Sequence, residues 1–448
     1  MKRTLCLLAL LLAAALMGLC AAHSWLNGSG EAVTLTRTDR AGDPSALEGL
    51  ALTLRYQRRY SLFWTVRAAL GGEAEARPET AVRFMQSDQP PQSGQQTEYL
   101  ELMPQVDFGV GSSGELSLTE DSQGQERLVR EVASRTGPGE TRTETLRYAD
   151  YYAAYPLQAY LRLNEWAVLA GEEETDLFWY EELLGPALAE SFAFPVGPDH
   201  QVEVTAAKDD SGAVRELSVF TLKGGPDVRT VSAVTAEACY FTFAGSLKPQ
   251  NVDFGLYRLP LTRGEERTTV FPDQVSLAFP LDPAAEPLLL SEDPEAKRLL
   301  LLTRREEDCL LTVLDGETLA ELQSLTLPLS AQTLETEAHW QDGCLLLRVD
   351  DGLALLERTA DGYHLALTAA LGRDFPRLSD QPERFDFHWD GARLAVAALG
   401  VSGGDPVWLR VYTPAGLAYA GSVSTSVGRL NGGVISADEY VPLSLGKR

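Results

Sequence analysis

The dominant pattern along the chain is a succession of short apolar runs separated by polar turns. Runs rich in Val, Leu, Thr and aromatic residues alternate with clusters of Gly, Asp and Pro, and few segments repeat with the helical period of 3.6 residues. Short alternating runs bounded by turn residues are typical of strands. We therefore expect an all-β fold.

In the C-terminal half the strand-like runs recur. Four similar runs start 60, 46 and 49 residues apart, and they cover 238–244, 298–303, 344–349 and 393–398. Two further strand-like runs follow each of them, and another precedes most of them, as 385–387 precedes 393–398. About four strands in 40–50 residues is the repeat of a β-propeller blade. The pattern predicts consecutive four-stranded antiparallel sheets over 228–423.

Two turns occupy matching places in this repeat. Asp342-Gly343 and Asp390-Gly391 each lie between the first and second strands of a unit, and Asp-Gly is a favoured sequence for tight hairpins. The run 387–396, Phe-His-Trp-Asp-Gly-Ala-Arg-Leu-Ala-Val, resembles the hairpins of TolB-type and WD-type propeller repeats, most clearly over 284–423. The resemblance implies a β-propeller fold, but those families share no single chemistry.

The N-terminal part does not align with the repeat. Strands are expected at 49–56, 61–70, 126–132 and 141–147. One short helix is expected over 175–184, because Thr175 or Asp176 can cap its start and Gly185-Pro186 ends it. We expect a β-rich region over 23–190, either divergent early blades or a separate β domain, and a propeller-like repeat region over 191–448.

Residues 1–22 have the composition of a secretory leader. Lys2 and Arg3 precede an uncharged apolar run from Leu5 to Ala22, which is the pattern of a signal peptide. Three readings stay open: a signal cleaved after Ala22, an uncleaved membrane anchor, and a lipoprotein modified at Cys20. All three predict an extracytoplasmic protein, secreted or held at the membrane by this segment alone.

Charge and cysteine content refine this picture. The chain carries 64 acidic against 38 basic residues, a net charge of −26. Such a charge repels phosphate backbones, so we expect no nucleic-acid partner. Beyond the leader, Cys239, Cys309 and Cys344 each lie inside a strand-like run. We expect them to be small buried residues; the alternatives are a disulfide plus one free thiol, or part of a metal site.

Motifs of known chemistry are incomplete in this chain. The Gly-rich segment 109–114 is followed by a strand-like run rather than the helix that a dinucleotide site requires. The segment 400–404 matches a nucleophile elbow, but no His follows it. His339 and His388 could approach each other from adjacent blades, although hairpin packing is the simpler role. We therefore predict no cofactor, no metal and no catalytic residue.

The most distinctive stretch is 148–182, which is rich in both aromatic and acidic residues. Aromatic faces beside carboxylates can stack on sugars or enclose a cation, but the same residues can form a packing surface. If a ligand binds here, these residues are the candidates: Tyr152, Tyr155, Trp166, Trp179, Tyr180 and Glu181.

The sequence favours a non-enzymatic binding or scaffolding protein outside the cytoplasm, whose partner is an unknown protein or glycan. A propeller offers a broad rigid face for such contacts. The alternatives are a propeller hydrolase or lyase that acts on glycans with acids from separate blades, and a ligand-sensing ectodomain of an anchored protein.

Overall fold

The structure is a computed structural model, and it describes most of the chain. The described residues are 11–21, 24, 33–58, 62–84, 98–111, 126–163, 167–169, 188, 191–265, 267–332, 336–372, 375, 385–399, 406–426 and 443–447. They form two compact units, residues 1–96 with 328–448 and residues 97–327. The second unit contains the position 190 at which the sequence suggested a boundary.

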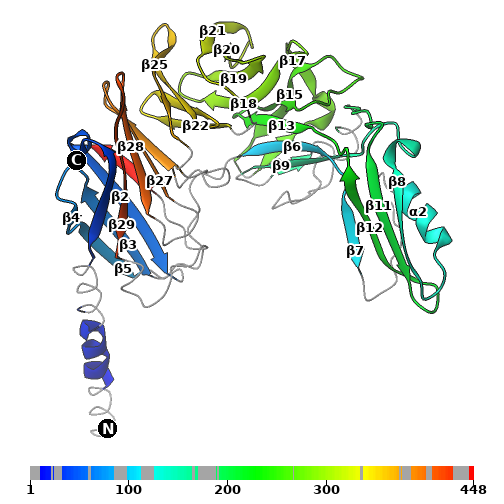
Figure 1. The fold of residues 1–448 in the computed structure, drawn as a ribbon, viewed down its shortest axis with the longest axis horizontal. Helices are drawn as coiled ribbons and strands as arrows, with labels where there is room; N and C mark the ends of the chain where they lie inside the picture. The colour runs from blue at the N-terminus through cyan, green and yellow to red at the C-terminus, as the bar shows by residue number, and fades with distance from the viewer. Residues whose placement is uncertain are drawn as a thin grey trace. The chain divides into compact units, whose positions relative to one another are not determined.

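Three antiparallel sheets make up the described part of the first unit (Figure 1). One contains β22 (Thr336–Gln341), β23 (Cys344–Val349), β24 (Gly352–Thr359) and β25 (Gly362–Ala370). The next contains β26 (Phe385–Trp389), β27 (Leu394–Leu399), β28 (Val407–Thr413) and β29 (Gly416–Thr425), followed by β1 (Leu35–Gly42) and β4 (Glu75–Ala76). The third contains β30 (Leu443–Lys447), β2 (Leu50–Arg58), β3 (Leu62–Ala69) and β5 (Glu79–Phe84).

Both ends of the chain complete sheets of the first unit. β1 pairs with β29 from Leu35↔Thr425 to Gly42↔Tyr419, so an N-terminal strand extends the sheet formed by β26–β29. β30 pairs with β2, so the C-terminal strand begins a sheet that is otherwise built from residues 50–84. The two sheets share an apolar core that includes Leu52, Leu409 and Leu445. Residues remote in sequence therefore depend on each other for their burial.

The two Asp-Gly turns join first and second strands, as the sequence predicted. At Asp342-Gly343 both residues have positive φ, 49° and 77°, which is the requirement of a two-residue type I′ hairpin. At Asp390-Gly391 only Gly391 has positive φ, 89°. There the Asp390 carboxylate accepts hydrogen bonds from the Ala392 and Arg393 N–H groups, at 3.0 and 2.8 Å, and holds a longer turn.

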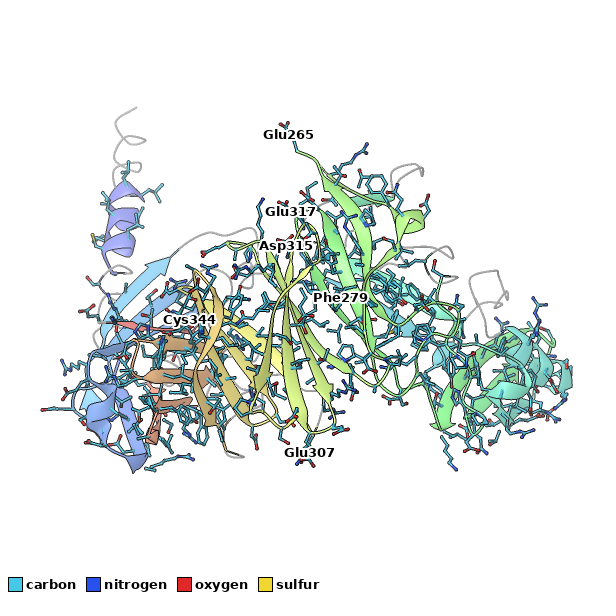
Figure 2. The ribbon with its side chains drawn as sticks, turned by 90° about the horizontal axis from the view of Figure 1, so that it is seen from above. Glu265, Phe279, Glu307, Asp315, Glu317 and Cys344 are labelled. Carbon is cyan, nitrogen blue, oxygen red and sulfur yellow. The ribbon has the colours of Figure 1, made fainter. Side chains whose placement is uncertain are left out.

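The second unit contains two further sheets of the repeat. One consists of β13 (Arg229–Val234), β14 (Ala238–Ala244) and β15 (Gly255–Arg263), with β17 (Ser276–Pro280), β16 (Thr268–Val270) and β10 (Ala167–Leu169) added. The other consists of β18 (Glu286–Asp293), β19 (Arg298–Arg305), β20 (Asp308–Asp315) and β21 (Glu321–Leu327). Asp315 and Glu317 lie at the β20–β21 turn (Figure 2). The chain is thus all-β with propeller-like four-stranded repeats, as expected.

The remainder of the second unit is a sheet covered by a helix (Figure 1). The sheet contains β7 (Phe108–Gly111), β12 (Val214–Lys223), β11 (Gln201–Lys208) and β8 (Thr141–Arg147). A separate pair consists of β6 (Tyr99–Pro104) and β9 (Leu157–Arg162). Three short 3-10 turns complete the described elements: η1 (Pro44–Leu47), η2 (Tyr148–Asp150) and η3 (Pro272–Gln274).

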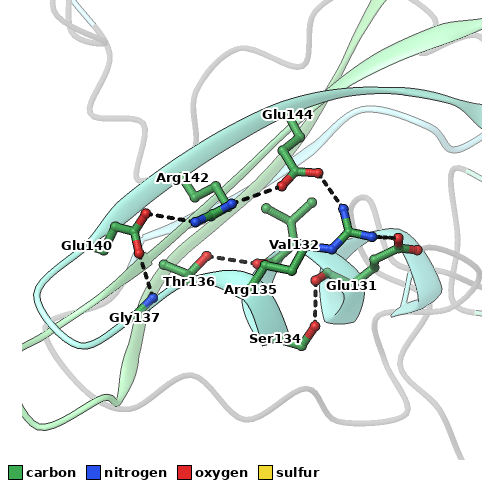
Figure 3. Close-up of polar contacts among 9 residues, drawn as sticks. All are labelled: Glu131, Val132, Ser134, Arg135, Thr136, Gly137, Glu140, Arg142 and Glu144. Atoms are coloured by element: carbon green, nitrogen blue, oxygen red, sulfur yellow. Dashed lines mark hydrogen bonds and ion pairs between the residues drawn. The ribbon is translucent and has the colours of Figure 1, made fainter.

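The strand predicted over 126–132 is wrong, because this segment is the start of helix α2 (Glu126–Arg135). Leu128, Val129, Val132 and Ala133 are buried and share one helical face against the sheet. On the polar side, Arg135 pairs with Glu131 and with Glu144 of β8 (Figure 3). The helix predicted over 175–184 lies outside the described residues.

Near the N-terminus, residues 11–21 are helical and their apolar side chains are exposed, as for Leu11 (62%), Met17 (67%) and Leu19 (68%). Among the helices that the structure describes, none is long and apolar enough to span a membrane.

Candidate functional site

Polar side chains gather on the first strands of two adjacent sheets in the first unit. Glu337 and His339 lie on β22, and Asp386 and His388 lie on β26. These edge strands lie beside each other, with the rings of His339 and Phe385 4.4 Å apart. We call these four polar residues the first-strand cluster.

Strand alternation places Asp386 and His388 on one face of β26, while Phe385 and Phe387 occupy the other face. Both phenylalanines belong to the apolar core between the sheets of β22–β25 and β26–β29. Asp386 instead faces the C-terminal strand: its Oδ2 accepts a hydrogen bond from the Leu445 N–H at 2.6 Å, and its Oδ1 accepts one from the Phe387 N–H at 2.9 Å. One carboxylate thus links two sheets.

Burial makes the charge of Asp386 costly. Desolvation raises the pKa of its carboxyl to about 6, and the two backbone N–H donors and the nearby His339 only partly counteract this effect. Asp342, another acid, adds to the rise. Asp386 is therefore a carboxyl that changes charge close to neutral pH.

His388 is nine-tenths buried, with 9% of its surface exposed, and its Nε2 has no hydrogen-bond partner among the residues that the structure describes. Burial lowers the pKa of its imidazole, and the positive charge of Lys447 on β30 adds to this effect. The neutral form of His388 is thus favoured.

On β22 the side chains of Glu337 and His339 interact with each other, and Glu337 also interacts with Arg348 of β23. His339 Nε2 lies 3.2 Å from the Glu337 carboxylate, and Arg348 Nη1 of β23 lies 3.7 Å from the same carboxylate. Glu337 therefore links its own strand to the next strand of the sheet.

The cluster offers two carboxyls and two imidazoles, but its polar atoms mostly bind the protein itself. Asp386 holds two backbone N–H groups, and Glu337 holds a histidine and an arginine. Among the residues that the structure describes, no three His, Cys, Asp or Glu side chains are arranged to bind a metal ion. The polar contacts of the described arrangement therefore fasten strands to each other.

His339 and His388 stood out in the sequence, whereas Asp386 did not. The structure places the two histidines on neighbouring first strands, as adjacent blades would. The available signal for Asp386 was a lone acid between two phenylalanines in a strand, since a half-buried strand alternates apolar and polar residues. Its partner Leu445 is 59 residues away, and no local pattern connects the two.

A second polar group lies in the core of the second unit, where tyrosines of the segment 148–182 meet His200. Tyr155 Oη lies 3.0 Å from His200 Nδ1 and accepts a hydrogen bond from the Gly197 N–H at 3.2 Å. The rings of Tyr148 and His200 stack with centroids 5.0 Å apart. Burial lowers the pKa of His200 and raises that of Tyr155. This group packs the β9 region against β11.

The predicted ligand-binding residues are only partly described. Tyr155 is buried, at 4% exposure, and Tyr152 packs against the same core, where its ring lies 4.9 Å from that of Tyr148. Trp166, Trp179, Tyr180 and Glu181 lie outside the described residues, so a ligand role for them stays a prediction.

Beyond the leader, the three cysteines are free and buried, as the sequence predicted: Cys239, Cys309 and Cys344. Cys344 begins β23 (Figure 2). Cys20, the candidate for lipidation, is exposed on the helical segment 11–21.

The pKa of Asp386 predicts how stability depends on pH. Because the folded-state pKa is raised from 3.8 to about 6, protonation favours the folded state, and this contribution is lost as pH rises through 6. Replacement by Asn removes the titration. We expect the difference in unfolding free energy between Asp386→Asn and wild type to shift by about 2–3 kcal/mol in favour of the variant between pH 4 and pH 8.

Urea unfolding of both proteins at several pH values measures this shift. The readout is the difference in unfolding free energy between the two proteins. His388 also titrates, with the opposite sign, but it does so in both proteins, so its contribution cancels in the difference. Asp361→Asn, in the exposed β24–β25 turn, makes the same chemical change at an exposed position and is the matched control. A free-energy difference for Asp386→Asn that stays constant with pH would contradict the buried-carboxyl account.

Comparisons with known proteins give no family. No family model matches the chain, and no curated protein is similar to it in sequence. Among solved structures, the chain is similar to a provisionally assigned 6-phosphogluconolactonase from Bacteroides fragilis, with 13% identity and a TM-score of 0.30 over 84% of this chain and 95% of that one.

Two other solved structures have similarly low sequence identity to this chain and similarly low TM-scores. A protein from Lactobacillus plantarum has 13% identity and a TM-score of 0.24, over 78% of this chain and 100% of that one. Prolyl oligopeptidase B from Galerina marginata has 9% identity and a TM-score of 0.23, over 48% of this chain and 28% of that one. Such low similarity carries no argument about function, and the fold described above rests on the sheets themselves.

Proposed function

We propose that this chain is an extracytoplasmic, non-enzymatic binding or scaffolding protein. The leader-like residues 1–22 motivate the compartment, and the repeated sheets motivate the binding role. A rigid stack of sheets presents strand edges and turns as a broad surface for a protein or glycan partner.

One observation carries the choice of a binding protein over an enzyme. The acids that come together from separate sheets are engaged with the protein: Asp386 holds the Leu445 and Phe387 N–H groups, and Glu337 holds His339 and Arg348. A general acid or base must reach the proton that it transfers. Carboxylates that fasten strands support a rigid frame instead.

A glycan-active hydrolase or lyase is the second candidate, and a specific observation favours it. Burial brings the pKa of Asp386 to about 6, which is the range of a catalytic acid, and His339 lies near it on the adjacent sheet. This reading needs Asp386 to be released from the Leu445 N–H during turnover.

The experiment compares binding and turnover in the same preparations. The full chain and its Asp386→Asn variant are applied to a glycan array, and both are incubated with a panel of chromogenic glycosides and unsaturated-product assays for lyase activity. We expect the same array profile for both proteins and no turnover by either, because Asp386 links β26 to β30 and does not act on a substrate.

Turnover by the wild type that falls by a factor of about 100 or more in Asp386→Asn would overturn the proposal and establish the enzyme. Asp390→Asn in the adjacent turn is the matched control, because Asp390 bonds to the local backbone of that turn.

A further inference from the structure

Helix α2 covers only one face of the sheet formed by β7, β12, β11 and β8 (Figure 1). The covered face carries Val202, Val204 and Leu217, which are buried in the same core as the apolar side of α2. The opposite face carries the residues that alternate with these, because successive side chains of a strand point to opposite sides. We call it the outer face of this sheet, and on it Phe220 of β12 is 50% exposed.

Strand register places three different side chains beside one another on the outer face. Glu203 of β11 lies opposite Phe220 on one side and opposite Thr145 of β8 on the other. Cross-strand neighbours of this kind have Cβ atoms about 5 Å apart. A ring, a carboxylate and a hydroxyl therefore form one row across three strands, which we call the outer-face row.

The adjacent row of the outer face consists of short side chains. Thr205 lies between Thr143 and Ser218, and the hydroxyl groups of Thr143 and Thr205 are 2.9 Å apart. Gly109 of β7 continues this row beside Ser218. Neighbours as short as these do not cover the Phe220 ring, which agrees with its exposure.

The Glu203 carboxylate is available to a ligand. It is half-buried, and among the residues that the structure describes none forms a hydrogen bond or an ion pair with it. The carboxylates of Glu337 and Asp386 are instead bound by other parts of the chain. Thr145, beside Glu203, is exposed.

The chemistry of the outer-face row suits a sugar better than a protein partner. A hexose has an apolar C–H face that can stack on an aromatic ring, and its hydroxyl groups can donate to a carboxylate. A protein interface needs a central apolar cluster. On the described strands of this sheet, the exposed large apolar side chains are Phe220 and Leu222 alone, and the adjacent row carries hydroxyl groups.

Charge restricts the kind of sugar. Glu203 and Glu216 lie on the outer face, and Lys223 ends β12. Arg147 of β8 is paired with Asp150. The face therefore carries little net charge, while the whole chain carries −26. Because such a chain repels sulfated and sialylated glycans, a neutral glycan fits this charge pattern.

We propose that the outer-face row binds a neutral glycan, with one hexose stacked on Phe220 and its hydroxyl groups bonded to Glu203 and Thr145. The glycan class narrows the protein-or-glycan partner proposed above, so this assignment rests on that binding role. The site uses none of the residues that composition suggested for ligand binding.

A glycan array that carries neutral, sialylated and sulfated oligosaccharides tests the site with the full chain, and we expect signal on neutral glycans only. The neutral oligosaccharide with the strongest signal is then titrated calorimetrically into the wild type, Phe220→Ala and Glu203→Gln. Each substitution should weaken binding roughly tenfold, through loss of a stacked ring or of a hydrogen bond to a charged group. Phe220→Trp keeps an aromatic face and should retain binding.

Two control variants make comparable changes at exposed positions of other sheets. Leu365→Ala on β25 removes an apolar side chain that is 40% exposed, and Glu321→Gln on β21 neutralises an exposed carboxylate. Both should bind the oligosaccharide as the wild type does. Circular dichroism during heating shows that each variant is folded.

Absence of array signal for the wild type would overturn the glycan site and leave a protein partner for the proposed binding role. Binding that survives both Phe220→Ala and Glu203→Gln would also overturn the site, because the glycan would then bind elsewhere on the chain. A preference for sulfated or sialylated glycans would overturn the assignment of a neutral ligand.

Discussion

Removal of residues 1–42 is expected to unfold the first unit, whereas removal of residues 1–22 should leave its stability unchanged. The difference is β1, which pairs with β29 along most of its length. Val33 and Leu35 are almost fully buried, at 1% and 3% exposure. Burial of two such side chains contributes about 3–6 kcal/mol, which is comparable with the whole stability of a typical domain.

Polar contacts of β1 add to this loss. The Arg37 guanidinium donates to the Leu70 and Gly72 carbonyl oxygens, at 2.6 and 2.9 Å, and the Tyr419 hydroxyl donates to Asp39 at 2.7 Å. Truncation leaves Tyr419 and one edge of β29 without these partners. Circular dichroism during heating of the two truncated chains measures the effect.

Point variants provide a matched control for the truncation. Leu35→Ala should cost about 2–5 kcal/mol, and Thr36→Ala, whose side chain is exposed, should cost less than about 0.5 kcal/mol. A chain lacking residues 1–42 that melts within a few degrees of the chain lacking residues 1–22 would show that β1 does not complete this sheet.

Phe243→Ala is expected to destabilise the second unit by about 3–5 kcal/mol. Phe243 is fully buried on β14, at 0% exposure. Its ring meets those of Phe192, Phe194 and Phe241 edge to face, with centroids 5.1, 5.0 and 5.8 Å apart. Edge-to-face pairs add to the energy of apolar burial, so truncation of this ring removes contacts from several partners at once.

Phe220→Ala is the control for this variant, because it makes the same chemical change on β12 where Phe220 is 50% exposed. We expect it to change stability by less than about 0.5 kcal/mol. Urea unfolding followed by tryptophan fluorescence and circular dichroism measures both. Equal losses for the two variants would mean that the aromatic cluster is not the core of this unit.

The sequence predicted the repeated sheets well because their signals are local. β14 (238–244) and β23 (344–349) have the predicted bounds, and Asp342-Gly343 forms the predicted hairpin. Strand alternation and turn chemistry act over a few residues, and a single sequence displays them directly. Helix α2 was read as a strand because its apolar residues, Leu128 and Val129 followed by Val132 and Ala133, also suit a short buried strand.

The sequence did not predict which distant strands pair with each other. β1 meets β29 nearly 400 positions away, and β30 meets β2 at a similar separation. The local sequence of neither strand identifies its partner, because strand register depends on matching apolar faces that many strands share. The expected division at residue 190 could not anticipate that residues 50–84 and 443–447 form one sheet.

The candidate site, too, could be predicted only in part from the sequence, because part of it depends on long-range contacts. His339 and His388 were considered together because their blades repeat, and that repeat is visible in the sequence. Burial raises the pKa of Asp386, and the hydrogen bond from the Leu445 N–H partly counteracts the rise; that contact exists only when the C-terminal strand is in place. The aromatic residues of 148–182 were candidates because of their composition, but Tyr155 is buried at 4% exposure, and composition does not encode exposure.

The central claim is that strands from both ends of the chain complete the sheets of the first unit. Hydrogen–deuterium exchange of the full chain, resolved to short peptides, tests it most directly, because paired backbone amides exchange slowly. We predict that peptides covering 35–42 and 443–447 are protected to a degree comparable with 407–413 in β28. Exchange of both end segments as fast as an unstructured chain, with β28 still protected, would contradict the account.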